Sequence, residues 1–218
     1  MKNFEAICNH LYDVIILLSL ILCGIRYRKL DKGARLIAIW VALGYISEFI
    51  AEIYARKFHT NTLVYSIYSL LELGVIGLYF SGTGAGLKKR HFVLRLTAIS
   101  ILAGVLYLIF IQPPDKLNSN FMFLECIIIS GLSLYAIFKM QNAPSVAIWR
   151  EVHFWIPAIL LFYECTAFWS WGVYNYVLNN IPNKTIYFSI ALLLINIITY
   201  AGISAVLIFY PKMNHSHV

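Results

Sequence analysis

The chain has 218 residues, of which 61% are hydrophobic and only 12% are charged, and its formal net charge is +7. Soluble proteins carry about 25% charged residues, so this composition, with a mean hydropathy of +0.75, excludes a soluble domain. The positive charge does not require a nucleic acid, because the anionic lipids of a membrane are its natural partner. The sequence therefore predicts the lipid bilayer, and no nucleic acid, as partner.

Seven stretches are apolar enough to cross a bilayer, which takes about 20 residues. They are residues 7–26, 34–55, 61–81, 92–112, 119–139, 150–177 and 186–210. These stretches use most of the chain and leave no room for a soluble catalytic domain. The sequence therefore predicts an all-α integral membrane protein, a single seven-helix bundle over residues 1–218.

The first stretch does not have the form of a cleavable signal peptide. Asn9, His10 and Asp13 interrupt it, and basic residues follow it where a signal peptide carries small ones. We therefore expect residues 7–26 to persist as the first helix.

Basic residues predict the orientation of the bundle. The larger share of the 17 lysines and arginines falls on the side opposite the N-terminus. By the positive-inside rule, the N-terminus is expected outside and the C-terminus in the cytoplasm.

The four cysteines form no CxxC pair, and each lies within or at the end of a predicted helix. Buried free thiols are the expected state. A bridge between Cys8 and Cys126, both near the predicted outer face, is the alternative, and spacing in the sequence does not support it.

Six of the ten carboxylates lie inside predicted helices, where an acid costs about 2.5–3.5 kcal/mol to insert and usually faces a protein interior or a wet cavity. They are Asp13, Glu48, Glu52, Glu72, Glu125 and Glu164. We therefore expect function to depend on a buried acidic interior.

The second predicted helix places Tyr45, Glu48, Glu52 and Arg56 on one face. Glu52 lies one turn from Arg56, so an ion pair at the membrane interface explains it as well as a functional role does. Asp13 in the first helix has a similar structural interpretation, as a hydrogen-bonding group near the headgroups. Glu48 has no such partner in its own helix.

The third predicted helix carries the clearest pattern. Asn61, Tyr65, Tyr68, Glu72 and Tyr79 recur at helical spacing and share one face. Because such a stripe cannot face lipid at low cost, we expect it to face the interior of the bundle.

The sixth predicted helix repeats this spacing with His153, Pro157, Glu164 and Trp171. Pro157 is better explained as a simple kink than as a gating hinge. Trp171 belongs to an aromatic group that also fits an interfacial belt. Glu164, in contrast, has no basic residue within reach in its own helix.

The remaining polar residues complete one expected site. Asn196 and Tyr200 in the seventh helix are better explained as interhelical hydrogen-bonding groups than as ligands. With the orientation above, all six acids fall in the outer half or near the middle of the membrane. We therefore predict an acidic and aromatic cavity that opens outward and closes about halfway down. Its candidate ligand-binding residues are Glu48, Glu72, Glu125, Glu164, Tyr65, Tyr68, Asn61 and Trp171.

Residue positions also exclude several cofactors. The seventh helix has no lysine for a retinal Schiff base and no histidine for the metal site of ceramidase-like membrane hydrolases. His10 and His153 lie toward opposite membrane faces and cannot hold one haem. No GxSxG motif is present. We expect no cofactor. A divalent cation bound by Glu48, Glu72 and Glu125 is the alternative.

Two segments carry a resemblance to a known family. Residues 61–72 (NTLVYSIYSLLE) and 153–163 (HFWIPAILLFY), with Glu48, Glu52 and Glu125, resemble a family of uncharacterised small seven-helix bacterial membrane proteins sometimes found near sensor histidine kinases. The resemblance runs from the second to the sixth predicted helix. It implies a multi-pass protein of the bacterial inner membrane with a signalling partner in the membrane or the cytoplasm.

Three functions fit these observations. The first is a sensor or receptor-like protein that binds a small ligand or cation without turnover. The second is a proton-coupled small-molecule transporter, in which buried carboxylates exchange protons. The third is an intramembrane hydrolase or lipid-modifying enzyme of the lysoplasmalogenase kind, in which paired carboxylates activate water directly or through a metal. A structural subunit is a further alternative. Binding without catalysis is the expectation we favour.

Overall fold

The computed structural model describes residues 2–82, 90–113, 118–141, 151–180 and 185–214. Side chains are described within these ranges except at 2–5, 171–176, 178–180, 185, 188 and 210–214. The helices are α1 (Lys2–Arg26), α2 (Lys32–Phe58), α3 (Thr62–Gly82), α4 (Arg90–Phe110), α5 (Ser119–Gln141), α6 (Val152–Asn180) and α7 (Thr185–Asn214), with a 3-10 turn η1 (Tyr27–Lys29). Each of the seven contains a segment long and apolar enough to cross a membrane, which confirms the predicted helical class.

Local sequence explains where α2 begins and ends. It begins before the predicted residue 34 because the Asp31 side chain caps it, accepting a hydrogen bond from the Ala34 N–H at 2.8 Å. It ends at Phe58, and His59 caps it: the φ of His59 is 58°, which is left-handed, and its N–H donates to the Ala55 carbonyl at 2.9 Å. These two caps fix the length of the helix that carries Glu48 and Glu52.

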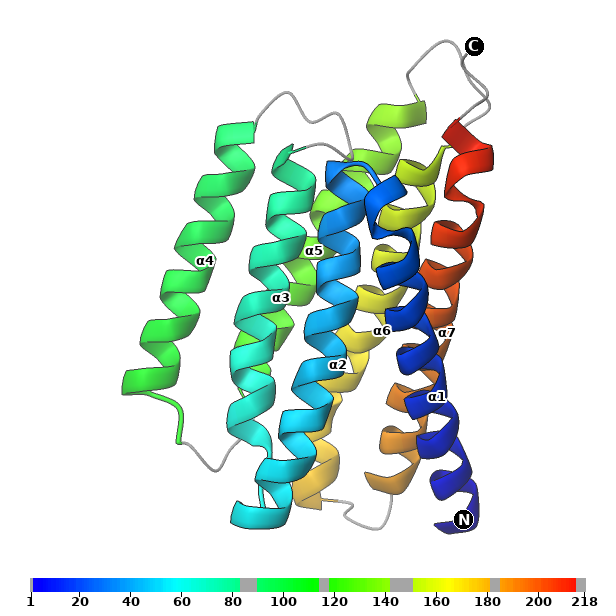
Figure 1. The fold of residues 1–218 in the computed structure, drawn as a ribbon. Coiled ribbons are helices and arrows are strands. Elements are labelled where there is room, and N and C mark those ends of the chain that lie inside the picture. Colours follow the sequence, from blue (N-terminus) through cyan, green and yellow to red (C-terminus); the bar gives the residue numbers. More distant parts are fainter. Residues whose placement is uncertain (1, 83–89, 114–117, 142–150, 181–184, 215–218) are drawn as a thin grey trace.

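Six of the helices close a ring, and α4 stands outside it (Figure 1). Around the ring, α1 packs on α2, α2 on α3, α3 on α5, α5 on α6, α6 on α7, and α7 on α1. The α4 helix packs mainly on α3, where Gly77 leaves room for Thr97; a Cβ at Gly77 would lie 2.3 Å from the Thr97 hydroxyl oxygen. Any site inside the ring is therefore built from six helices.

The two ends of the ring differ in packing. We call the end where α1, α3, α5 and α7 begin the open end, and the other the basic end. Large, fully buried side chains fill the half of the bundle toward the basic end. They include Ile37, Trp40, Ile76, Tyr79, Phe80, Ile129, Ile156, Leu160, Ile203 and Leu207. The core thus closes the ring from the basic end to about its middle.

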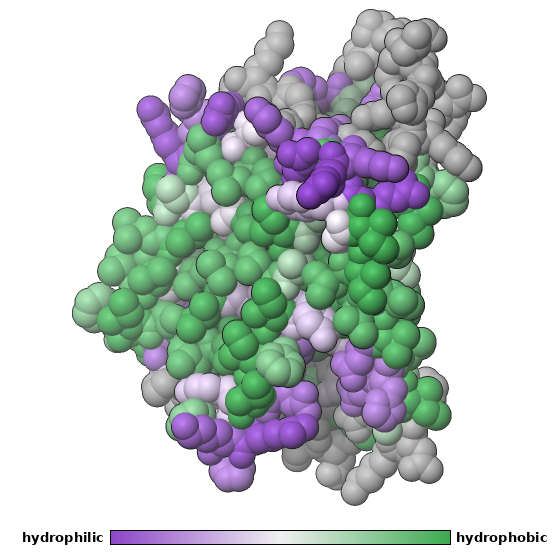
Figure 2. Space-filling model, in the orientation of Figure 1, coloured by the Kyte–Doolittle hydropathy of each residue, from purple (hydrophilic) through white to green (hydrophobic). Residues whose placement is uncertain are grey.

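The outer surface is apolar, as a lipid-facing surface must be. Figure 2 shows a broad apolar band between polar residues at the two ends. Leucine, isoleucine and phenylalanine side chains of α4 are among the most exposed, including Ile99, Leu102, Ile109 and Phe110. The chain therefore has the architecture of a multi-pass membrane protein.

A polar contact ties three helices together at the basic end. His153 Nε2 lies 2.7 Å from Asp31 Oδ2, and its Nδ1 lies 3.4 Å from the Tyr79 hydroxyl. His153 and Tyr79 had been predicted to share a polar stripe with Glu164 and Glu72, but they lie in the packed half of the ring. Their role is to join α6 and α3 to the N-cap of α2.

Replacing His153 by alanine is expected to destabilise the protein by about 1–2 kcal/mol, because it removes these contacts and loosens a helix cap. Thermal unfolding in detergent, followed by circular dichroism, measures the change. His91→Ala, at an exposed position on α4, is the matched control and should leave the unfolding temperature unchanged. Equal effects of the two substitutions would contradict the proposed structural role.

Candidate functional site: an acidic and aromatic cavity

A cavity of about 910 Å³ occupies the half of the ring toward the open end. All six ring helices line it, and no described residue of α4 does. The six acids of the predicted helices all line this one space. They are Asp13, Glu48, Glu52, Glu72, Glu125 and Glu164. The packed core closes this space about halfway along the ring.

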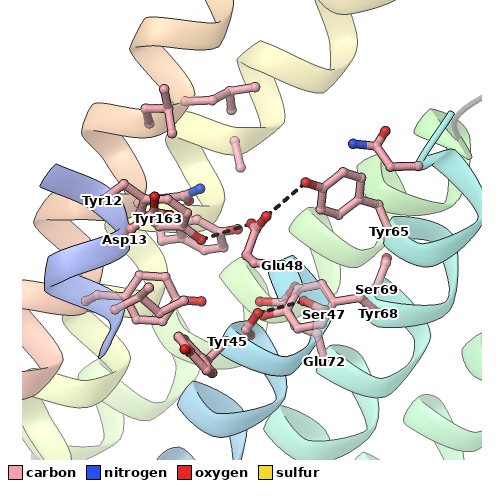
Figure 3. Close-up of a pocket in the computed structure, with 18 of the residues that line it drawn as sticks. Tyr12, Asp13, Tyr45, Ser47, Glu48, Tyr65, Tyr68, Ser69, Glu72 and Tyr163 are labelled. Atoms are coloured by element: carbon pink, nitrogen blue, oxygen red, sulfur yellow. Dashed lines mark hydrogen bonds between the residues drawn. The ribbon is translucent and has the colours of Figure 1, made fainter. Parts of the chain in front are cut away.

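Glu48 lies at the centre of a three-helix contact. Its Oε1 accepts a hydrogen bond from the Tyr12 hydroxyl of α1 at 3.0 Å, and its Oε2 accepts one from the Tyr65 hydroxyl of α3 at 2.9 Å (Figure 3). Both oxygens of this half-buried carboxylate are therefore engaged by phenols. The arrangement orients the Glu48 side chain within the cavity and links α1 to α2.

The deepest wall of the cavity is an aromatic cluster around Glu72. The Trp40 indole N–H donates to Glu72 Oε1 at 2.8 Å, and both side chains are buried. The Trp40 ring stacks on Tyr200 with centroids 5.8 Å apart and meets Tyr163 edge-on at 6.4 Å. Trp40 thus belongs to the packed core on one side and supports the cavity wall on the other.

Glu125 and Glu164 each have one carboxyl oxygen without a partner. The side chains are only 4% and 2% exposed, yet neither Oε1 accepts a hydrogen bond from any described group. The other Glu125 oxygen accepts a hydrogen bond from Ser69 on α3. An unpartnered buried acceptor costs about 1–3 kcal/mol. A bound ligand with a donor or a positive charge would offset that cost.

The described lining of the cavity carries carboxylates and no basic side chains. No lysine, arginine or histidine occurs among the described residues that line it. The ion pair predicted between Glu52 and Arg56 is present, but at exposed positions at the open end. Glu72, Glu125 and Glu164 lie close enough to interact electrostatically. The described cavity is therefore an acidic space without a cation of its own.

A glycine makes the deep wall possible. A Cβ at Gly44 would lie 2.3 Å from the Tyr200 hydroxyl oxygen and 3.5 Å from that of Tyr68. Because Gly44 has no side chain, both phenols approach the α2 backbone just above Trp40. Gly44 therefore lets the phenols of Tyr68 on α3 and Tyr200 on α7 reach the α2 backbone at this level.

The structure places most predicted site residues in the cavity. Besides the acids, Asn61, Tyr65 and Tyr68 line it. The side chain of Trp171 lies outside the described residues. Pro157 is buried in α6 and does not line the cavity.

Tyr12, Trp40 and Ser69 are among the contributors that were not predicted. Tyr12 could have been found from the helical spacing it shares with buried Ile16 and Ser19 of α1. Trp40 and Ser69 carry weaker signals, because each resembles an ordinary core residue of its helix. Their roles depend on the neighbouring helix, which spacing along one helix cannot identify.

The structure decides between free thiols and a disulfide for all four cysteines. Cys8, Cys23, Cys126 and Cys165 are free, so the possible Cys8–Cys126 bridge is wrong. Cys126 lines the cavity beside Glu164. Cys165 differs from the expectation of burial, because it is exposed on α6.

The chemistry of the cavity is that of cation recognition. Carboxylates supply charge, phenols supply oxygen atoms and ring faces, and ring faces attract ammonium groups. Among the described residues, no three His, Cys, Asp or Glu side chains are grouped so as to hold a metal ion. Comparison with family models, curated proteins and solved structures gives no match to this chain.

Proposed function

We propose that this protein is a receptor-like membrane protein that binds a small organic cation, an amine or a quaternary ammonium, in the cavity of the six-helix ring. The observation that carries the proposal is the acidic cavity itself. It holds the unpartnered oxygens of Glu125 and Glu164, and its described lining has no basic residue.

Size and composition support an organic ligand. Ligand pockets usually measure about 300–1,000 Å³, and this cavity of about 910 Å³ is at the upper end of that range. Tyr12, Tyr65, Tyr68, Tyr163 and Tyr200 line it, and aromatic walls favour ammonium groups over strongly hydrated metal ions. A divalent cation is the other ligand that carboxylates support, and titration with Ca²⁺ and Zn²⁺ tests it.

Choline and its uncharged isostere 3,3-dimethylbutan-1-ol provide the test. Calorimetric titration of the protein in lipid nanodiscs should show binding of choline and none of the neutral alcohol. Glu72→Gln and Glu164→Gln should each weaken choline binding by about ten- to a hundredfold, because each replaces a carboxyl group, which an ammonium can hold in its charged form, by an amide that carries no charge.

Glu151→Gln is the matched control, since Glu151 lies just before α6 at the basic end and does not line the cavity; it should change choline affinity by less than about twofold. Equal binding of the alcohol and choline, or normal choline binding by both Glu72→Gln and Glu164→Gln, would refute the proposal. Recovery of intact choline after incubation distinguishes binding from turnover.

The proposed orientation puts the open end outside the cell and the basic end in the cytoplasm. Arg28, Lys29 and Arg35 lie at the basic end, where a signalling partner in the bacterial inner membrane or cytoplasm would dock. Movement of α6 about Pro157 is the proposed route from the cavity to that end. The resemblance to seven-helix proteins found near sensor histidine kinases supports this role.

Proton-coupled transport is the second candidate. It is favoured by the depth of Glu72, Glu125 and Glu164, because buried carboxylates in membranes are typical of proton relays. Uptake of labelled choline into proteoliposomes, driven by a pH gradient, separates the two functions. A receptor should give no uptake above that of empty liposomes.

A further inference from the structure

The cavity is open along its side as well as toward the open end. Val14 and Leu17 of α1 and Phe49 of α2 line the cavity, yet they are 53%, 42% and 59% exposed. A side chain that both lines a cavity and faces the surroundings stands at the rim of an opening. These three residues, on two neighbouring helices, define an opening that we call the α1–α2 slit.

The arrangement of the helices explains the slit. α1 and α2 are joined through η1 at the basic end, and they separate toward the open end (Figure 1). In Figure 2, polar side chains interrupt the apolar surface over the lower half of these helices. At this level, the Tyr12 to Glu48 hydrogen bond runs from one helix to the other.

The slit lies at the depth of the hydrocarbon, away from the aqueous phase. Phe49 precedes the end of α2 at Phe58 by nine residues, or about 13 Å at 1.5 Å per residue. Val14 and Leu17 lie about 18 and 22 Å from the start of α1 at Lys2 by the same rise. With a hydrocarbon core about 30 Å thick, this rim meets lipid chains.

The chemistry changes across the slit. Val14, Leu17 and Phe49 are apolar, whereas Asp13, exposed beside Val14, and the Glu48 and Tyr12 side chains line the same cavity. Asp13 is exposed far along a membrane helix, a costly position for a carboxylate that faced lipid alone. A cationic group that enters through the slit passes Asp13 before it reaches Glu48.

From this geometry we infer that the natural ligand is an amphipathic amine, whose ammonium headgroup occupies the cavity while its hydrocarbon tail leaves through the α1–α2 slit into the bilayer. The inference rests on the proposed binding of organic cations and adds the class of ligand. A tail anchored in lipid also explains why the opening reaches the middle of the membrane.

The test compares two probes with the same headgroup, choline and dodecyltrimethylammonium, on the protein in nanodiscs, with binding to empty nanodiscs subtracted. Val14→Trp places a bulky ring at the rim of the slit. It should weaken binding of dodecyltrimethylammonium by about tenfold or more and leave choline affinity within about twofold. Normal choline binding by this variant also shows that it is folded.

Leu18→Trp is the matched control, on the lipid-facing side of α1 at 52% exposure and outside the cavity lining; it should change neither affinity. Unchanged binding of dodecyltrimethylammonium by Val14→Trp, or an equal loss for both probes, would overturn the slit as a tail exit while choline binding stands. Failure of both probes to bind the unmodified protein would instead refute the cation-binding function, and this inference with it.

Discussion

Replacing Trp40 by alanine is expected to destabilise the protein by about 3–5 kcal/mol, the usual cost of truncating a buried tryptophan. Trp40 is 1% exposed, stacks on Tyr200 and contacts Tyr163. Its removal opens a hole between the packed core and the cavity and leaves Glu72 Oε1 without its indole donor. Thermal unfolding in detergent, followed by circular dichroism, measures the loss.

Two variants separate the causes of this effect. Trp169→Ala removes the same side chain at a position 72% exposed and should leave stability nearly unchanged. Trp40→Phe keeps most of the ring contact but removes the N–H donor, so its smaller loss reports mainly on the hydrogen bond to Glu72, about 1–3 kcal/mol for a buried acceptor left without a donor. A Trp40→Ala protein as stable as Trp169→Ala would contradict the position of Trp40 between core and cavity.

Replacing Gly44 by alanine is expected to abolish choline binding at concentrations that saturate the unmodified protein. The added Cβ would lie 2.3 Å from the Tyr200 hydroxyl oxygen, and Tyr200 cannot retreat because it is buried and stacked on Trp40. The phenol ring of Tyr200 must therefore shift into the cavity or push α7 outward. Overpacking of this kind costs about 1–3 kcal/mol, so calorimetric titration should be accompanied by thermal unfolding.

Gly24→Ala is the matched control, because nothing lies within 4 Å of a Cβ at Gly24 in α1. This variant should bind choline normally and be as stable as the unmodified protein or up to about 1 kcal/mol more stable, since alanine favours a helix over glycine. Undiminished choline binding by Gly44→Ala would show that Tyr200 does not limit the cavity.

The sequence was most informative where a single helix determines the answer. Spacing along α3 predicted that Asn61, Tyr65, Tyr68 and Glu72 face inward, and all four line the cavity. The same spacing extended to Tyr79, which is buried in the packed core instead. A stripe gives the face of a helix, but where the cavity stops along that stripe depends on side chains of other helices.

Contacts between helices could not be predicted from the sequence for the same reason. The partners Tyr12 and Glu48 are 36 residues apart, and Trp40 and Glu72 are 32 apart. Their meeting depends on the order of helices around the ring and on the rotation of each helix. Composition does not determine either property, and it gives no sign that α4 lies outside the ring, because residues 90–110 are as apolar as the other spans.

The joint between α1 and α2 has a mechanical consequence. η1 is held against α2 by Arg35, whose Nε donates to the Tyr27 carbonyl at 3.2 Å and whose guanidinium lies over the Tyr27 ring at 5.6 Å. A hydrocarbon tail that separates α1 from α2 at the open end would rotate α1 about the contact between η1 and Arg35. Arg28 and Lys29 lie in η1 itself, so occupancy of the cavity would displace positive charge against the membrane surface.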